Sequence, residues 1–211
     1  MTVFLMKPQS ASAQFGIKIG ALAGEDFAGS QTLPSPFPAG SAQGASGYTL
    51  GLVIDKNLVG PFSIMTEFLL TQRTFKEDMT VPSEGSSPVT WTEKLQYLQI
   101  PVLFKVSPLD GAFQPYGFIG PNIGFKLSAS AITDSTGSSQ TDDKSALFNS
   151  VDLGLDLGLG LGVEVMPLTT VFADARYTYG LVDVYNHYNA SGAGDLRARD
   201  VKWTAGVMIG F

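Results

Sequence analysis

The residues of this sequence that could take part in chemistry are mainly carboxylates, and they occur in two settings. Some, such as Asp152 and Asp156, alternate with leucine and valine inside regular segments. Others lie in or beside polar connections, where Asp183, Asp195 and Asp200 are candidates for a paired-carboxylate hydrolase by position only. Such an enzyme uses one carboxyl group as a general acid and another as a base or nucleophile. Position alone does not assign that role, so evidence for catalysis would have to come from other residues, such as a histidine or a metal-binding cluster.

Nucleophilic catalysis has little support in the sequence. A Ser-His-acid arrangement or a lipid-deacylating site needs a placed histidine, and the only one is His187, within a polar connection. A lone histidine in a connection is more often a solvated polar residue than a base. Asp134, Asp142 and Asp143 are calcium candidates, but their spacing fits no EF-hand loop, and cysteine is absent. The sequence therefore predicts no catalytic residue, no cofactor and no metal site.

The elements that carry the alternating carboxylates are strands, and residues 151–165 show the pattern most clearly. Every odd position there is Val or Leu, and every even position is Asp, Gly or Glu. A period of two places successive side chains on opposite faces of a strand. The second face is small and acidic, which suits a crowded interior better than contact with water. A soluble sandwich strand with buried leucines is the alternative, and this segment alone favours it, because the barrel signal is weak per strand.

Seven further segments alternate in the same way, so the whole chain decides between sandwich and barrel. The connections between them are long and short in turn. Bacterial outer-membrane barrels show this pattern, because their periplasmic turns are short and their outer loops are long. The sequence therefore predicts an all-β fold, an eight-stranded antiparallel up-and-down transmembrane β-barrel with periplasmic termini. The expected strands are residues 15–24, 48–55, 62–71, 91–106, 113–129, 151–165, 170–181 and 201–211, and the long loops are 25–46, 74–90, 130–146 and 182–199.

The composition of the 211 residues agrees with a membrane barrel. Only 15% of the residues are charged, against about a quarter in soluble domains. No apolar run has the length of a transmembrane helix, so such a chain would cross a membrane as a closed barrel. The net charge of −6 and the lack of clustered Lys and Arg argue against a nucleic-acid partner. We expect one barrel domain, residues 14–211, in contact with outer-membrane lipid.

The first thirteen residues have some features of an export signal. Residues 1–6 are apolar, and Ala11 and Ala13 give the small-x-small form of a signal-peptidase site. A basic n-region is missing, and the apolar part is short for a signal. Residues 1–13 are therefore interpreted either as the remnant of a signal peptide or as part of the mature chain.

Ionisable side chains of both signs fall on the faces predicted to point inward. A lumen enclosed by eight strands is just wide enough for side chains to fill, so these groups should pair across it. Unpaired charge in that space would be costly, and we favour a salt-bridged core over a selective pore or proton path. The expected lumen charge network comprises Lys18, Glu67, Lys105, Lys126, Asp152, Asp156, Glu164, Asp174, Arg176 and Lys202.

Aromatic residues gather near both ends of the predicted strands. Outer-membrane barrels carry aromatic girdles at their two membrane interfaces. We predict one girdle at the long-loop end and another at the short-turn end. The first comprises Tyr48, Tyr177, Tyr179 and Trp203, and the second Phe15, Phe62, Phe104 and Phe211.

Three prolines conflict with uninterrupted pairing in a closed barrel. Proline cannot donate a hydrogen bond to the strand ladder, and a closed barrel has no free edge. Pro101, Pro115 and Pro121 are therefore each expected to mark a bulge, a strand end or a local kink.

Several motifs resemble those of a known family. Residues 95–105, Leu-Gln-Tyr-Leu-Gln-Ile-Pro-Val-Leu-Phe-Lys, are similar to a signature of the PorT-like outer-membrane β-barrel proteins of Bacteroidota and relatives. The resemblance implies an eight-stranded barrel inserted by the barrel-assembly machinery, for which a final aromatic such as Phe211 is the usual signal. One member takes part in a secretion system, and most have no assigned activity. Other pieces that fit in the same order are residues 16–18, 67–70, 115–116, 120–121 and 174–181.

Three functions can be weighed for such a barrel. The first is a non-enzymatic scaffold or binding module with a protein partner, as a subunit of a larger envelope or secretion complex. The alternative is a channel for small solutes or hydrophobic compounds. The third, lipid modification, predicts that His187→Ala abolishes an activity on lipid A or phospholipid.

Overall fold

The computed structural model of the chain describes residues 16–28, 31–32, 41–79, 89–109, 111–135, 138–143, 149–183 and 197–211. Residues 1–13, the expected signal remnant, lie outside this part of the chain. Every regular element described is a strand. The strands are β1 (Ile17–Ala28), β2 (Gln31–Thr32), β3 (Ser41–Val59), β4 (Phe62–Met79), β5 (Val89–Val106), β6 (Phe113–Ser135), β7 (Ser138–Asp143), β8 (Val151–Met166), β9 (Thr169–Asp183) and β10 (Arg197–Gly210).

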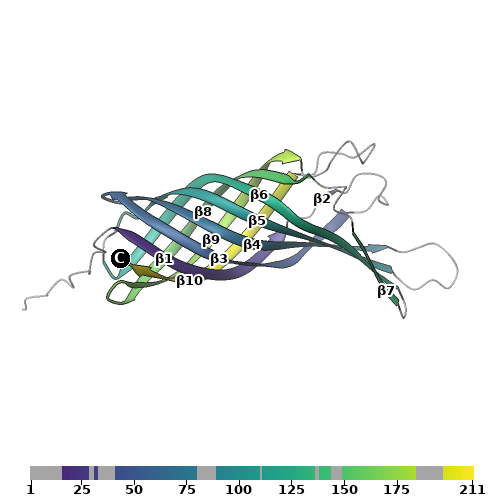
Figure 1. Ribbon diagram of the computed structural model, residues 1–211, viewed down its shortest axis with the longest axis horizontal. Helices are drawn as coiled ribbons and strands as arrows, with labels where there is room; N and C mark the ends of the chain where they lie inside the picture. The colour runs from purple at the N-terminus through teal and green to yellow at the C-terminus, as the bar shows by residue number, and fades with distance from the viewer. Residues whose placement is uncertain are drawn as a thin grey trace, which may run out of the picture.

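The strands close into a barrel (Figure 1). β1 pairs with β10 on one side and with β3 on the other, so the sheet returns to its starting strand. The remaining neighbours follow chain order, and every pairing is antiparallel. Eight strands form the barrel, while β2 and β7 are short additions to β3 and β6. The predicted eight-stranded up-and-down barrel is therefore confirmed.

Among the described residues, no helix is long and apolar enough to cross a membrane.

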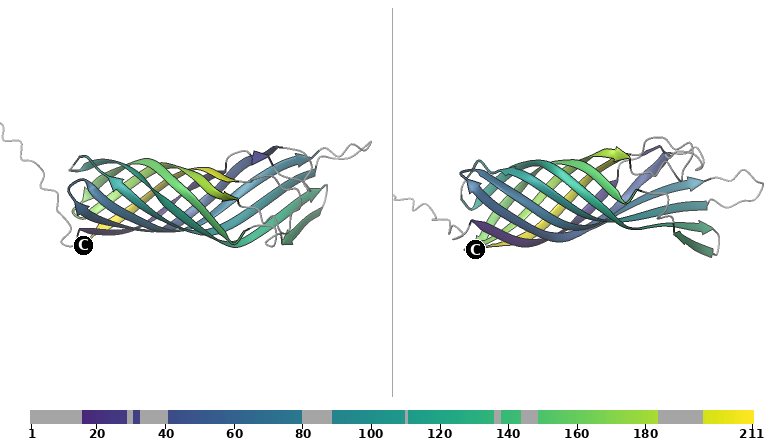
Figure 2. Two further views of the ribbon diagram at one scale, coloured as in Figure 1. Left: turned by 90° about the horizontal axis from the view of Figure 1, so that it is seen from above. Right: turned by 45° about the horizontal axis from the view of Figure 1, so that its top comes forward.

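Several strands continue well beyond the expected ends. β4 and β5 remain paired as far as Met79 and Val89, and β6 pairs with β7 up to Ser135 and Ser138. Figure 2 shows these hairpins projecting past the closed part of the barrel. The expected bounds of all four loops, 25–46, 74–90, 130–146 and 182–199, are therefore wrong. The physical reason is that backbone pairing needs no apolar face, so hydrophobic alternation ends before the strands do.

Short connections lie at the opposite end of the barrel. β3 joins β4 through residues 60–61, and β8 joins β9 through residues 167–168. Gly60 has a φ of +57°, a conformation that glycine adopts without a steric penalty. The carboxyl terminus lies at this same end in Figure 1.

The two faces of the barrel differ sharply in exposure. On β8, Leu157 and Leu159 are 56% and 73% exposed, whereas Asp152 and Asp156 are 5% and 0% exposed. The bulky apolar side chains therefore point outward, and the acidic ones point into the lumen. This is the reverse of a soluble β-protein and fits an outer wall in contact with lipid.

The prolines disturb the ladder less than expected. Pro115 lies close to the start of β6 at Phe113, which agrees with the prediction of a strand end. At Pro121 the register between β6 and β8 continues without a shift, so no bulge lies on that side. On the β5 side the paired positions pass from Asn122 to Ile119, so Pro121 lies in a short gap of the ladder. Loss of one N–H removes one ladder bond, and the flanking pairs hold the register. The register between β5 and β6 is also the same on both sides of Pro101.

Candidate functional site in the barrel interior

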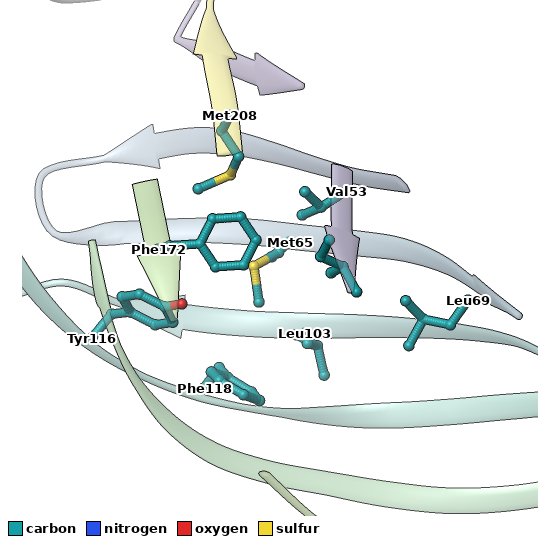
Figure 3. Close-up of a cluster of buried hydrophobic side chains, with 9 residues drawn as sticks. Val53, Met65, Leu69, Leu103, Tyr116, Phe118, Phe172 and Met208 are labelled. Carbon is teal, nitrogen blue, oxygen red and sulfur yellow. The ribbon is translucent and has the colours of Figure 1, made fainter. Parts of the chain in front are cut away.

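A cluster of apolar side chains occupies the middle of the lumen (Figure 3). Two glycines of β8 make room for it, because a Cβ at Gly158 or Gly160 would overlap the ring of Phe118 or Tyr116. The glycine face of β8 is therefore a surface against which aromatic rings pack. The cluster comprises Leu22, Val53, Met65, Leu69, Leu103, Tyr116, Phe118, Phe172 and Met208.

Arg176 is the centre of the first charged group, and it lies beside this cluster. Its two terminal nitrogens donate to the two carboxylate oxygens of Glu67, at 2.6 and 3.0 Å. Nε and Nη2 also donate to Asp174 Oδ1, at 3.3 and 3.0 Å. Tyr116 and Thr204 donate to the same carboxylate. We call Arg176, Glu67 and Asp174 the middle tier; its forked pairing is the strong form of an Arg–carboxylate contact.

A second charged group lies toward the short turns. Lys105 Nζ is 2.5 Å from Asp55 Oδ2, and it also lies 4.3 Å from the centre of the Tyr116 ring. Lys18 donates to Gln114 and Thr170, at 3.3 and 3.2 Å. Both lysines are therefore held by side chains from other strands, which ties the strands together across the lumen.

Arg73 anchors the third group, toward the long-connection end. Its Nη1 donates to Asp152 Oδ2 at 2.8 Å, and Nη2 lies 2.5 Å from Asp200 Oδ2. The second contact is an ion pair, and neither oxygen of Asp200 makes a hydrogen bond with the described residues. The guanidinium carbon lies 5.0 Å from the centre of the Tyr97 ring.

Lys202 and Asp156 extend this third group inward. Lys202 Nζ donates to Gln99 Oε1 at 2.6 Å, but Asp26 Oδ2 is 3.7 Å away, beyond hydrogen-bond distance. Asn122 donates to both oxygens of Asp156, at 3.3 and 3.1 Å. We call Asp26, Arg73, Asp152, Asp156, Asp200 and Lys202 the mouth tier; all six are 5% exposed or less.

The predicted charge network is placed as follows. Lys18, Lys126 and Glu164 are half-buried. Lys105, Lys202 and Asp152 pair with residues outside the predicted set. Within the set, the ion pairs described are those of Arg176 with Glu67 and Asp174. The predicted residues buried in the lumen are Glu67, Lys105, Asp152, Asp156, Asp174, Arg176 and Lys202.

Four buried ionisable residues were missed by the sequence analysis: Asp26, Asp55, Arg73 and Asp200. Three of them lie beyond the strand ends that hydrophobic alternation defined, and Asp55 is the last residue of the expected strand 48–55. The alternation of β4 could have identified Arg73, because Arg73 continues the series of inward-facing residues Glu67, Leu69 and Thr71. Asp200 had been considered for a carboxylate pair, and the structure instead places it against Arg73.

The structure does not describe most of the other residues considered for catalysis or metal binding. His187, Asp195 and Phe15 lie outside the described part of the chain, as do the side chains of Asp134, Asp142, Asp143 and Asp183. Among the residues that the structure describes, no group of three or more His, Cys, Asp or Glu is placed to hold a metal ion.

The aromatic residues of both expected girdles that the structure describes project from the outer wall. Tyr48 and Trp203 are both paired with Glu25 of β1, so they lie on either side of Glu25 at the long-connection end. At the other end the rings of Phe62 and Phe104 stack, with centroids 5.6 Å apart. The outward aromatic side chains, which are 37–59% exposed, are Tyr48, Tyr177, Tyr179, Trp203, Phe62, Phe104 and Phe211.

A shallow groove crosses the same outer wall. Its volume is about 720 Å³, and alanines of β1, β9 and β10 form its floor, including Ala23, Ala173 and Ala205. Leu161 and Trp203 contribute larger side chains to its lining. The groove exists because three neighbouring strands carry small residues where the rest of the wall carries large ones.

A closed antiparallel barrel with an apolar outer wall and a filled lumen is the structure of an outer-membrane β-barrel protein. Residues 8–186 match the family described as "Outer membrane protein beta-barrel domain", and the chain belongs to that family. It is therefore a porin-like, eight-stranded barrel of the bacterial outer membrane.

Solved structures with a similar barrel are known at low sequence identity. Neisserial surface protein A is 19% identical with a TM-score of 0.47, and the match covers 93% of this chain and 97% of that one. OprG from Pseudomonas aeruginosa is 17% identical with a TM-score of 0.48, covering 95% and 98%. Ail of Yersinia pestis is 15% identical with a TM-score of 0.40, covering 92% and 98%. A comparison with curated proteins finds no match.

Proposed function

We propose that this chain is a non-enzymatic member of the PorT-like group that serves as a scaffold or binding module. In this proposal it is a subunit of a larger envelope or secretion complex, and it contacts a protein partner through the parts that project from the membrane. The barrel-assembly machinery would insert it, with the terminal Phe211 as part of the signal.

The filled interior is the observation that supports this function best. Apolar side chains occupy the middle of the lumen, and buried ion pairs lie on both sides of them. A solute would have to displace the rings of Phe118 and Phe172 together with the Arg176–Glu67 pair. Because close-packed interiors resist such displacement, a barrel of this kind is better suited to holding a partner than to conduction.

Conductance measurements test this proposal against the channel alternative. Purified wild-type barrel in planar bilayers should give no discrete steps. A variant with Phe118→Ala, Met65→Ala and Phe172→Ala, which empties the middle of the lumen, is the positive control and should conduct. Reproducible single-channel steps from the wild type would reject the scaffold proposal and favour a small-solute channel.

The outer groove is the feature that favours the hydrophobic-compound form of the alternative. Its alanine floor offers an apolar surface on the wall that faces lipid. Uptake of a labelled hydrophobic compound into cells that express wild-type protein or Ala205→Phe tests this idea. A loss of uptake in the variant would support transport, whereas equal uptake would remove the alternative.

The strands that project beyond the barrel support a binding role. The β4–β5 and β6–β7 hairpins extend past the closed wall in Figure 2, and strands of this kind can offer backbone groups to a partner. Cross-linking in native membranes, followed by purification of the barrel, should recover one stoichiometric protein. Shortening the β6–β7 hairpin should abolish that recovery, and a barrel recovered alone in every preparation would contradict the proposal.

The orientation that we propose places the short turns and both termini in the periplasm. Because the chain has no cysteine, a single introduced thiol reports its own side of the membrane. In intact cells a membrane-impermeant maleimide should label Arg199→Cys, at the long-connection end, and leave Leu109→Cys unlabelled until the outer membrane is opened. The reverse result would invert the proposed orientation.

A further inference from the structure

We propose that the groove on the outer wall holds one membrane lipid whose headgroup carries a primary ammonium, a property that does not depend on the scaffold role. The groove lies on β8, β9, β10 and β1, which are successive neighbours in the barrel. Paired residues form a row across these four strands, and three of them are alanines, so the wall is hollowed along this row. The row is Leu161, Ala173, Ala205 and Ala23.

The next row toward the long connections forms one border of the groove. It consists of Leu159, Ala175, Trp203 and Glu25, paired in that order. Leu159 and Trp203 are 73% and 59% exposed, because the alanine between them is too short to cover either side chain. Their uncovered flanks lack the apolar contacts that close packing supplies. An acyl chain that lies in the groove provides such contacts.

Glu25 places a carboxylate at this border, on the side of the barrel that faces lipid. Its side chain is exposed and shares the outer face of β1 with Phe27. Its cross-strand partners are Trp203 of β10 and Tyr48 of β3, both of the long-connection girdle. A negative charge therefore lies at the level where hydrocarbon meets the lipid headgroups.

No side chain of the described residues neutralises Glu25. It takes part in no hydrogen bond or ion pair within that part of the chain. Arg199, on the neighbouring strand β10, lies over the Tyr179 ring instead, with its guanidinium carbon 5.6 Å from the ring centre. An exposed carboxylate costs little in water, but an uncompensated charge beside hydrocarbon is unfavourable. In this proposal the bound lipid supplies the positive charge.

The surroundings of Glu25 define the headgroup. A primary ammonium donates charge-assisted hydrogen bonds to a carboxylate. Directly paired residues on one sheet face have Cβ atoms about 5 Å apart, so an ammonium at Glu25 also lies beside the indole of Trp203, the ring that attracts cations most strongly. An anionic headgroup would be repelled. A lipid of the phosphatidylethanolamine type therefore fits, with its ammonium at Glu25 and its acyl chains over the alanine row.

Fluorescence quenching at the groove tests the proposal. Trp91→Phe leaves Trp203 as the only tryptophan, and this full-length barrel is reconstituted in phosphatidylcholine vesicles. Part of the host lipid is replaced by phosphatidylethanolamine or by phosphatidylglycerol with brominated acyl chains, which quench a tryptophan that they touch. We expect the relative binding constant at Trp203 to favour phosphatidylethanolamine roughly three- to fivefold, as for a partly exposed ion pair.

Two pairs of variants assign the preference to the groove. Glu25→Gln removes the charge and keeps the shape, so it should abolish the preference. Glu164→Gln, at the short-turn end, changes the net charge equally and should retain it. Ala205→Phe fills the floor of the groove and should reduce the preference, whereas Val171→Phe, outside the lining of the groove, should retain it.

The quenching results either support the bound lipid or exclude it. A preference for phosphatidylethanolamine that Glu25→Gln and Ala205→Phe weaken, and that both controls retain, supports it. Equal binding constants for the two brominated lipids would overturn the proposal. A preference that survives Glu25→Gln, or that Glu164→Gln weakens equally, would also overturn it, because that result indicates attraction to the charge of the whole barrel.

Discussion

The middle tier and the mouth tier are both buried in one lumen, but they satisfy their charges differently. Arg176 makes forked contacts with Glu67 and further bonds to Asp174, which in turn accepts from Tyr116 and Thr204. In the mouth tier, by contrast, both oxygens of Asp26 and of Asp200 lack hydrogen bonds.

The side chains around each tier explain why their charges are satisfied differently. The middle tier is enclosed by the apolar cluster, where an unsatisfied charge would have no compensation, so each polar group there must find a protein partner. The mouth tier lies outside that cluster, toward the long-connection end of the lumen, and its side chains are buried among polar and charged groups. Position in the lumen therefore separates carboxylates that accept several hydrogen bonds from carboxylates that are held mainly by ion pairs.

Removal of the central cation should give the largest effect. Arg176→Met leaves Glu67 and Asp174 as two uncompensated buried carboxylates, so unfolding free energy should fall by about 3–5 kcal/mol. Guanidinium unfolding in micelles measures it. The double variant Arg176→Met, Glu67→Gln should recover part of the loss; no recovery would show that lost packing, not charge, is the cause.

An arginine placed on the outer wall tests where the membrane lies along the barrel. Leu157→Arg, in the middle of β8, should destabilise the folded barrel in bilayers by about 2–4 kcal/mol, because the guanidinium enters hydrocarbon. Val151→Arg, at the mouth end of β8, should cost about 0–1 kcal/mol, because the interface is near. Equal effects at both positions would contradict the placement of the membrane around the middle of β8.

A single methyl group should distinguish the packing of the two regions. Gly158→Ala places a Cβ inside the Phe118 ring and should cost about 1–3 kcal/mol through overpacking. Gly124→Ala meets Asp152 Cβ and Tyr97 Cδ1 at 3.4 and 3.5 Å, ordinary contacts, and should be nearly neutral. The two are compared by denaturant unfolding, and a neutral Gly158→Ala would mean that the middle of the lumen is loosely packed.

Loss of a mouth carboxylate should give the smallest effect. Asp26 makes no hydrogen bond, and its carboxylate lies 3.7 Å from Lys202, so Asp26→Asn should change the unfolding free energy by less than about 1 kcal/mol. The measurement is the same denaturant titration used for Arg176→Met. A loss as large as that of Arg176→Met would remove the distinction between the tiers.

Strand alternation was readable from sequence because it reflects a local constraint. Leu153 to Leu161 face outward and the glycines and aspartates between them face inward whatever the neighbouring strands are, since the pleat sets the period. Strand ends were not readable, because β4, β5 and β6 leave the membrane and no longer need an apolar face. Asp26, Arg73 and Asp200 were missed for this reason, although continuing the alternation of their strands would have placed them on the inward face.

The sequence by itself determined a closed eight-stranded barrel, its apolar wall and an interior of glycine, charge and aromatic rings. Only the tertiary structure decided which charges meet. Arg176 and Glu67 are separated by 109 residues and join across the lumen, and Lys105 reaches Asp55 rather than a predicted partner. The physical reason is that alternation is a property of one strand, whereas pairing across a barrel depends on the register of all eight.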